Sequence, residues 1–298
     1  MNSPSPNYSR LQIWILAARP KTLWAAVAPV VIGAAVAIDD GFVHIASLVA
    51  ALLGAIFIQI GTNFANDLFD FKKSVDTAER LGPLRVTQAG LVTPAQMRNA
   101  TILAFGIAFT IGIYLVFRGG WPIVAIGLLS ILFGVLYTGG PYPLGYNGLG
   151  DIFVLIFFGP VAVGGTYYVM SQTVTAEVIL CGLSPGLLST AILVVNNIRD
   201  IKTDSVTGKR TLAVRFGRRF SEVQYLLLVA AALVYPAIAF AVTRSHGLAM
   251  IAVAAVIPAI PVMRLVLKEE GAILNSALAG TGRVLAVYSA LFAIGWLL

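Results

Sequence analysis

The chain has 298 residues and a formal net charge of +7, yet only 11% of its residues are charged, while 58% are hydrophobic. A soluble domain carries about 25% charged residues, so this composition excludes a soluble globular protein. The single cysteine, Cys181, excludes a disulfide framework and a cysteine-based metal site.

Apolar runs close to the roughly 20 residues that cross a bilayer recur along the chain. They predict an all-α integral membrane protein, in which residues 1–298 form a single domain built as a nine-helix bundle. The predicted spans are 22–38, 43–66, 98–117, 121–138, 149–170, 174–197, 222–243, 247–264 and 281–298. A polar segment, 1–21, precedes the first span, and two long polar loops, 67–97 and 198–221, follow the second and sixth spans.

Basic residues are concentrated on one side of these spans. With the N-terminus in the cytoplasm, all 20 Lys and Arg residues except Arg118 and Arg244 fall in cytoplasmic segments. This distribution follows the positive-inside rule and predicts a multi-pass protein of the cell (inner) membrane, with the N-terminus and both polar loops in the cytoplasm. Because orientation in the lipid bilayer explains the basic excess, no nucleic-acid partner is expected.

The second span ends in the run Asn63-Phe-Ala-Asn66-Asp67-Leu-Phe-Asp70, which we call the first acidic cluster, and Asp76 follows it. If the helix continues to about residue 70, Asn63, Asp67 and Asp70 are spaced i, i+4 and i+7 and share one face. Carboxylates on one face repel each other unless a cation lies between them. Hard oxygen ligands of this kind suit Mg²⁺, which also bridges to substrate phosphates.

The sixth span ends in the run Asn196-Asn197-Ile-Arg-Asp200-Ile-Lys-Thr-Asp204, the second acidic cluster. Asn196, Asp200 and Asp204 are spaced i, i+4 and i+8 and again share a helical face. One such face is equally consistent with a solvated helix end. Two of them, each at the cytoplasmic end of an apolar span, favour a functional site, because ionisable groups at membrane spans are costly.

Basic residues follow each cluster, Arg80 and Arg85 after the first, and Lys209 and Arg210 after the second. Taken singly, each is also explained as a membrane anchor. Together with a carboxylate-bound metal, they supply the positive charge that a diphosphate requires.

A diphosphate held at the mouth of an apolar bundle indicates a lipid substrate, and an allylic prenyl diphosphate fits. Ionising its C–O bond requires a stabilised leaving group, and the resulting carbocation requires a dry cavity with aromatic faces. The aromatic candidates are Tyr137, Tyr142, Phe157, Phe158, Tyr167 and Tyr168. Aromatic residues in membrane helices also serve in packing and interface belts, so no single one is decisive.

The chain resembles the intramembrane aromatic prenyltransferase superfamily over essentially its whole length. The matching stretches are Arg19-Pro-Lys21-Thr-Leu, NFANDLFD ending at Asp70, Arg80-Leu-Gly-Pro-Leu-Arg85, YTGGPYPLGYNGLGD from Tyr137 to Asp151, and NNIRDIKTDSVTGKRTLAVRFG from Asn196 to Gly217. The resemblance implies a nine-helix fold with a central cavity open to lipid and a polar cytoplasmic cap.

The resemblance also implies roles for individual residues. The magnesium-diphosphate ligands would be Asn66, Asp67, Asp70, Asn197, Asp200 and Asp204, with the four aspartates acting in catalysis. Substrate-binding roles are expected for Lys21, Asn63, Arg80, Arg85, Tyr137, Asn196 and Lys209. Which basic residue holds diphosphate and which holds an acceptor carboxylate stays open, and Asp76 sits further along than the general pattern of the superfamily.

Within the superfamily, the chain is most similar to members that prenylate 1,4-dihydroxy-2-naphthoate. The implied reaction transfers a polyprenyl group from polyprenyl diphosphate with decarboxylation, giving demethylmenaquinone. Siblings that act on 4-hydroxybenzoate or another aromatic quinone precursor share both acidic clusters and form the alternative. A transporter is a remote alternative, because transport sites usually lie near the bilayer midplane, whereas these carboxylates lie at one membrane face.

Overall fold

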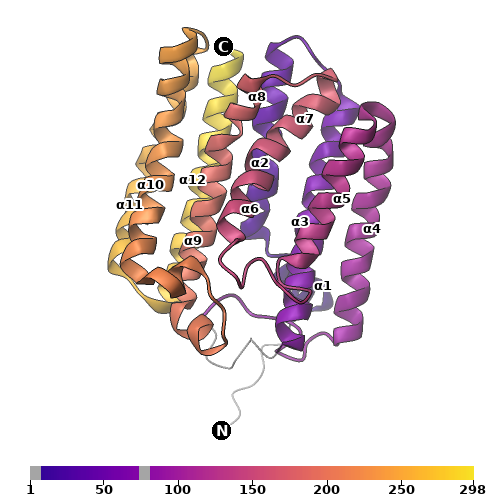
Figure 1. The fold of residues 1–298 in the computed structure, drawn as a ribbon, viewed down its shortest axis with the longest axis vertical. Coiled ribbons are helices and arrows are strands. Elements are labelled where there is room, and N and C mark those ends of the chain that lie inside the picture. Colours follow the sequence, from indigo (N-terminus) through magenta and orange to yellow (C-terminus); the bar gives the residue numbers. More distant parts are fainter. Residues whose placement is uncertain (1–7, 74–80) are drawn as a thin grey trace.

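The computed structural model describes residues 8–73 and 81–298. In these ranges the regular secondary structure consists of helices (Figure 1). They are α1 (Arg10–Ala18), α2 (Pro20–Asp39), α3 (Ile45–Lys72), α4 (Pro94–Gly119), α5 (Trp121–Leu136), α6 (Gly150–Ile156), η1 (Phe157–Val161), α7 (Ala162–Ser171), α8 (Ala176–Cys181), α9 (Leu183–Val206), α10 (Leu212–Thr243), η2 (Gly247–Ala255), α11 (Val256–Lys268), η3 (Gly271–Ile273) and α12 (Leu274–Leu297).

The helices of the bundle have the length and the exposed apolar side chains expected of membrane-spanning segments. Within residues 8–73 and 81–298, eight helical segments are long and apolar enough to cross a membrane. The further apolar helix α5 has 16 residues and rises about 24 Å, less than the roughly 30 Å of a hydrocarbon core. Large apolar side chains such as Phe117 and Val242 are exposed on the outside. The predicted all-α integral membrane fold is confirmed, while the count of nine spans stays a prediction.

Several spans are interrupted where the sequence predicted continuous helices. The span predicted at 149–170 consists of α6, η1 and α7, and Gly159 within it has non-helical torsion angles (φ −122°, ψ −109°). Pro160 follows this break and has no N–H with which to continue the helix. The helix α9 continues to Val206, so the second acidic cluster is helical and the non-helical connection to α10 is short.

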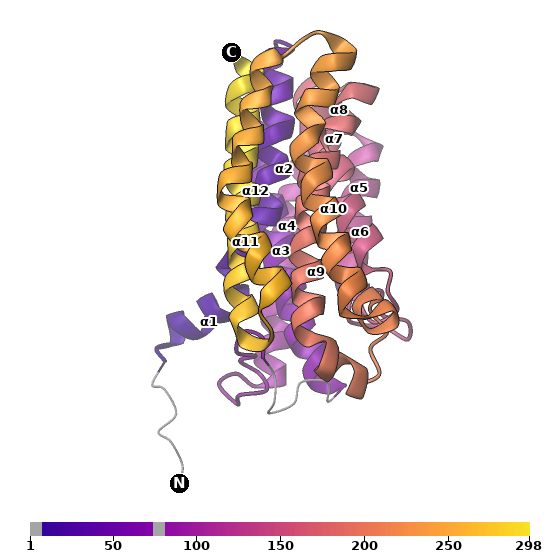
Figure 2. The ribbon, with the colours of Figure 1, turned by 90° about the vertical axis from the view of Figure 1, so that its left-hand side faces the viewer.

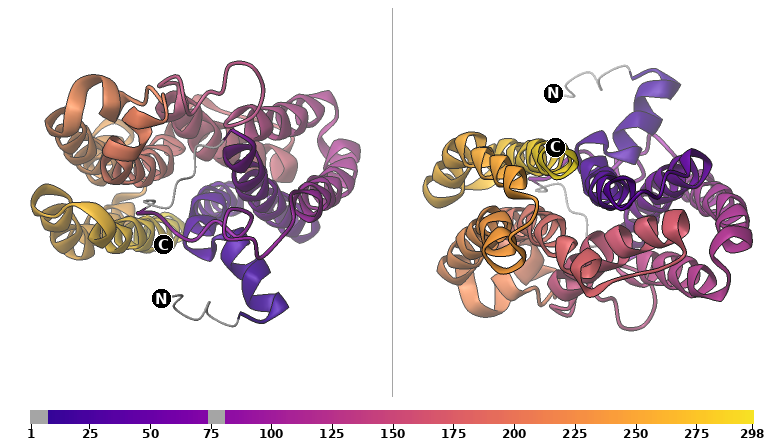
Figure 3. Two further views of the ribbon diagram at one scale, coloured as in Figure 1. Left: turned by 90° about the horizontal axis from the view of Figure 1, so that it is seen from below. Right: turned by 90° about the horizontal axis from the view of Figure 1, so that it is seen from above.

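The helices form two side groups with a third between them. In Figure 1, α10, α11 and α12 lie on one side, α3, α4 and α5 on the other, and α2, α6 and α9 between them. Viewed along the bundle, α4 and α11 lie at opposite sides (Figure 3). The largest core joins α2, α9, α10 and α12, where Ile32, Leu188, Tyr225 and Phe292 are buried.

A second, smaller core lies at the end of the bundle that carries α1, which projects from the helices in Figure 2. It joins Ala17 of α1, Leu68 of α3, Val86 and Met97. Because Val86 belongs to the connection between α3 and α4, this core holds that connection beside the end of α3.

The close approach of α9 to α6 and η1 depends on a glycine. A Cβ atom at Gly186 would lie 2.5 Å from the backbone oxygen of Leu155 and 3.1 Å from the Cα of Gly159. Both neighbours are backbone atoms, so a larger residue would move one helix against the other. This contact aligns α9, which carries the second acidic cluster.

We therefore expect Gly186→Ala to destabilise the protein by about 1–3 kcal/mol, as overpacking does. Thermal denaturation in detergent should show a lower midpoint. The matched control is Gly106→Ala in α4, where a Cβ atom would meet nothing within 4 Å. Equal midpoints for the two variants would contradict the assigned contact.

Candidate active site

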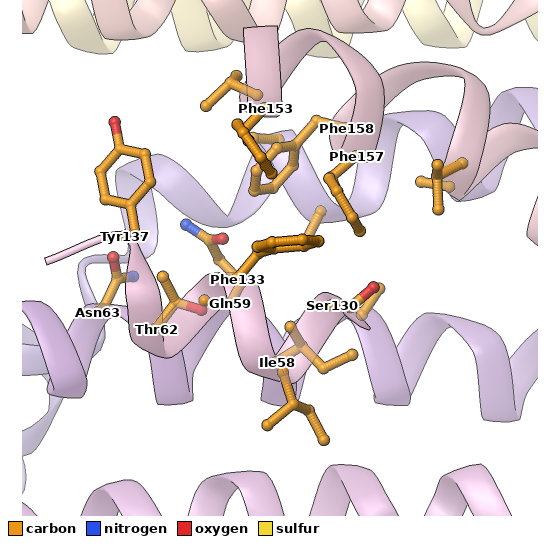
Figure 4. A pocket seen from close by; sticks show the side chains of 18 of the residues that line it. Ile58, Gln59, Thr62, Asn63, Ser130, Phe133, Tyr137, Phe153, Phe157 and Phe158 are labelled. Carbon is orange, nitrogen blue, oxygen red and sulfur yellow. The ribbon is translucent and has the colours of Figure 1, made fainter. Parts of the chain in front are cut away.

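A cavity of about 750 Å³ runs between the helices and joins a polar end to an aromatic end. Its polar end is lined by Asn63, Asn66, Asp70, Arg85, Tyr137, Asn196, Asn197, Asp200, Asp204 and Lys209. Figure 4 shows the transition from Asn63 and Tyr137 to the ring cluster of Phe133, Phe153 and Phe157. Both acidic clusters, far apart in sequence, therefore face one cavity.

The cavity also reaches the lipid-facing surface. Phe117 and Leu128 line it, and both are largely exposed on the outside of the bundle. A hydrocarbon chain can therefore extend from the polar end of the cavity into the bilayer without entering water.

The amides of the first cluster connect α3 to its neighbours. Asn63 donates to the backbone oxygen of Ala18 at 2.9 Å and to Thr22 Oγ1 at 3.2 Å, which ties α3 to the junction of α1 and α2. Asn66 Oδ1 accepts a hydrogen bond from Thr138 Oγ1 at 2.9 Å. Both asparagines line the cavity at its polar end.

The carboxylate of Asp67 points away from this cavity. It is 1% exposed and accepts the backbone N–H groups of Val86 and Thr87, each at 3.2 Å. These charge-assisted hydrogen bonds hold segment 81–92, the described part of the connection that leads into α4. Asp67 therefore positions the residue that precedes Val86 in this segment, Arg85.

The carboxylate of Asp70 does face the cavity, where the guanidinium of Arg85 and the hydroxyl of Tyr146 both donate to it. Two ammonium groups lie close to the ring of Tyr146, with Lys73 Nζ 4.9 Å and Lys209 Nζ 4.8 Å from its centroid. Partial burial lowers the pKa of Lys73, and the nearby Asp70 carboxylate opposes that shift. This group concentrates positive charge around one carboxylate.

The second cluster is organised by Arg199, which is buried on α9. Its Nε and Nη2 atoms donate to the two oxygens of Asp200 at 2.8 and 2.6 Å, and Nη2 also donates to Asn196 Oδ1 at 2.7 Å. Its Nη1 donates to Asn275 Oδ1 at 2.7 Å, and Asn275 donates in turn to the backbone oxygen of Leu81 at 2.8 Å. The second cluster is thereby connected to segment 81–92.

The remaining carboxylate of the second cluster, Asp204, has a cationic partner from the chain that follows α9. Lys209 Nζ lies 3.4 Å from Asp204 Oδ1. Asn197 also lines the cavity. Lys209 thus lies against both Asp204 of the second cluster and the ring of Tyr146, whose hydroxyl donates to Asp70 of the first cluster.

Tyr137 owes its position to small neighbours. A Cβ atom at Gly145 would lie 2.9 Å from Cε1 of its ring, and one at Gly150 would lie 2.9 Å from its hydroxyl oxygen. The glycines in the 137–151 stretch therefore leave room for this ring against the cavity wall.

Not every predicted site residue lines the cavity. Lys21 is exposed, whereas its neighbour Arg19 lines the cavity from a left-handed conformation (φ 52°) between α1 and α2. Arg80 and Asp76 lie outside the described residues. Sequence reasoning did not single out Arg199 and Tyr146, although both lie inside stretches that carried the resemblance.

The donor set at the polar end fits a magnesium ion. In the described ranges, no three His, Cys, Asp or Glu side chains are grouped closely enough to enclose a metal by themselves. Mg²⁺ is commonly bound by one or two carboxylates together with substrate phosphates, so a complete protein cage is not needed. Asp70, Asp200 and Asp204 would supply the carboxylates and Asn66 and Asn197 the amide oxygens, since all five line the cavity.

Residues 26–279 match the UbiA prenyltransferase family. The chain belongs to this family. It is 40% identical over 255 residues to the 1,4-dihydroxy-2-naphthoate octaprenyltransferase of Haemophilus influenzae, with 82% of each chain covered. It is 42% identical over 217 residues to the enzyme of the same name from Escherichia coli, with 70% of each chain covered. The membrane prenyltransferase family expected from the sequence is confirmed.

Solved structures share the fold at low sequence identity. A UbiA homologue from Aeropyrum pernix in its apo form aligns with a TM-score of 0.70 at 14% identity, covering 92% of this chain and 97% of that one. A UbiA homologue from Archaeoglobus fulgidus bound to GPP and Mg²⁺ aligns with a TM-score of 0.63 at 15% identity, covering 96% and 99%.

The contacts of Asp67 generate a testable expectation. Asp67→Ala removes both acceptors for the Val86 and Thr87 N–H groups, so amide hydrogen exchange in segment 81–92 should accelerate on the order of 10-fold or more. Hydrogen-exchange mass spectrometry measures this directly. Asp204→Ala is the matched control, because it alters the second cluster and should leave exchange at these two amides unchanged. Unchanged protection in Asp67→Ala would refute the anchoring role.

Proposed function

We propose that this protein is a magnesium-dependent polyprenyltransferase that transfers a polyprenyl group from polyprenyl diphosphate to 1,4-dihydroxy-2-naphthoate with loss of carbon dioxide, giving demethylmenaquinone in its reduced (quinol) form. The observation that carries this proposal is that Asp70 of α3 and both Asp200 and Asp204 of α9 line the polar mouth of one apolar cavity. The names of the relatives in Haemophilus influenzae and Escherichia coli support the acceptor. The one-sided distribution of basic residues supports a cytoplasmic position for this mouth in the inner membrane.

The polar end binds the diphosphate in this proposal. Asp70, Asp200 and Asp204, with Asn66 and Asn197, would hold Mg²⁺, which when bound neutralises charge on the leaving diphosphate. Arg85 and Lys209 lie against these carboxylates and can donate to phosphate oxygens or to the carboxylate of the acceptor. Cations held in place at the leaving group stabilise its developing negative charge most strongly in a site from which water is excluded.

The aromatic end receives the prenyl chain. Phe133 contacts Phe153 with ring centroids 4.7 Å apart and Phe157 with centroids 5.4 Å apart. Aromatic faces stabilise a nearby cation, and the apolar walls keep water from capturing it. The side chains of the cavity therefore suit an allylic carbocation with a hydrocarbon tail.

The proposed reaction balances without an added oxidant or base. The prenyl C1–O bond breaks, and its electron pair leaves with the diphosphate. The electron-rich ring carbon that bears the carboxylate forms the new bond to C1. The bond to the carboxylate then breaks, carbon dioxide leaves, and the electron pair restores the aromatic ring, so the product is first released as the quinol.

Prenyl transfer by the purified protein in lipid tests this proposal, with farnesyl diphosphate, Mg²⁺ and either 1,4-dihydroxy-2-naphthoate or 4-hydroxybenzoate. We expect carbon dioxide release and a prenylated naphthoquinol from the naphthoate, both abolished by EDTA. Asp200→Ala should lower turnover on the order of 100-fold. Glu270→Ala, which changes an exposed carboxylate paired with Lys202 and Arg218, serves as the control.

Two outcomes would contradict the proposal in different ways. Product from 4-hydroxybenzoate alone would retain prenyl transfer and reject the naphthoate acceptor. Full turnover in EDTA, or in Asp200→Ala, would reject the magnesium-diphosphate site itself.

A further inference from the structure

Gln59 of α3 is a buried polar side chain that lies about one helical turn before the first acidic cluster. It is 9% exposed and lines the cavity. In Figure 4 its amide points into the cavity, between Tyr137 on one side and Phe133 on the other. It therefore lies at the boundary between the polar end and the aromatic end.

The amide of Gln59 forms no hydrogen bond with any residue in the ranges 8–73 and 81–298. Its neighbours on the same helix differ, because Asn63 donates to Ala18 and Thr22, and Asn66 accepts from Thr138. A side-chain amide offers two donors and one strong acceptor, and the amide atoms of Gln59 are open to the cavity rather than enclosed by protein. Gln59 thus presents hydrogen-bonding capacity to the interior of the cavity rather than to the protein.

Its depth separates Gln59 from the diphosphate site. Gln59, Asn63, Asn66 and Asp70 recur at helical spacing on the cavity face of α3. At about 1.5 Å per residue, Gln59 lies roughly 10 Å deeper along the helix than Asn66 and still farther from Asp70. A diphosphate bound at the acidic clusters would not extend this far, so the amide faces the region where the prenyl carbon and the acceptor ring would meet.

The chemistry of the two substrates indicates which of them Gln59 recognises. A prenyl chain has no polar group with which to pair an amide. A ring hydroxyl both donates and accepts hydrogen bonds, which matches the oxygen and nitrogen of a side-chain amide. A hydroxyl that donates to the amide oxygen also becomes a stronger electron donor to its ring.

We propose that Gln59 binds a ring hydroxyl of the aromatic acceptor and thereby determines acceptor specificity. This inference rests on the proposed transfer to a dihydroxynaphthoate. Sites that hydrogen-bond a substrate hydroxyl reject analogues that lack it, because their buried polar group is then left unpaired. Gln59 is accordingly the residue that distinguishes the dihydroxy ring from a monohydroxy ring.

The test compares calorimetric dissociation constants, measured without prenyl donor, for 1,4-dihydroxy-2-naphthoate and for its analogues 1-hydroxy-2-naphthoate and 4-hydroxy-2-naphthoate. In the unmodified protein, loss of the contacted hydroxyl should weaken binding about 5- to 100-fold. In Gln59→Leu and in the near-isosteric Gln59→Met, that preference should fall to about 2-fold or less, because the partner of the hydroxyl is gone. The KM for farnesyl diphosphate should not change in either variant.

Ser130→Ala is the matched control, since Ser130 is another polar residue of the cavity wall, on α5. It should retain the preference for the dihydroxy ring. Retention of that preference in both Gln59 variants, or a rise in the KM for the prenyl donor alone, would overturn the inference. Failure of the proposed function looks different, because the unmodified protein would then not prenylate the dihydroxynaphthoate at all.

Discussion

Four carboxylates are buried at the end of an apolar helical bundle, and each needs a hydrogen-bonded or charged partner from the chain around it. A charged group in a low-dielectric surrounding is costly unless it is paired and hydrogen-bonded. Asp67 and Asp70 obtain their partners from segment 81–92, through two backbone N–H groups and the Arg85 guanidinium. Asp200 obtains its partner from Arg199, one position earlier on the same helix. Asp70 thus has two roles, because it holds segment 81–92 through Arg85 and also faces the cavity in which the substrate would bind.

Segment 81–92 connects the two halves of the site as a consequence. The N–H group of Val86 donates to Asp67 at the end of α3. The backbone oxygen of Leu81 accepts a hydrogen bond from Asn275, which in turn accepts one from Arg199 of α9. Both acidic clusters are therefore fixed to one segment, although they lie on different helices. Preorganisation of this kind is what electrostatic stabilisation of a leaving group requires. The apolar walls beyond it then receive the hydrocarbon chain.

The sequence predicted the parts of this arrangement that depend on local periodicity. Apolar runs identified the spans, and helical spacing predicted that Asp200 and Asp204 share one face of their helix, which the structure places on the cavity wall together with Asp70. Helical spacing could not show that Asp67 turns toward segment 81–92. That contact forms only because the chain, after leaving α3, folds back beside the end of that helix. Nor could helical spacing show that a left-handed Arg19 replaces Lys21 at the cavity, because this conformation is uncommon for arginine.

The central claim is that both clusters hold one magnesium-diphosphate. Calorimetric binding of farnesyl diphosphate with and without Mg²⁺ tests it most directly, using Asp70→Ala from α3, Asp204→Ala from α9 and the double variant. A shared site predicts that either single change removes most of the magnesium-dependent affinity and that the double variant loses little more, since residues of one network are not additive. Two independent losses that sum in the double variant, or magnesium-dependent binding that survives either single change, would contradict the account.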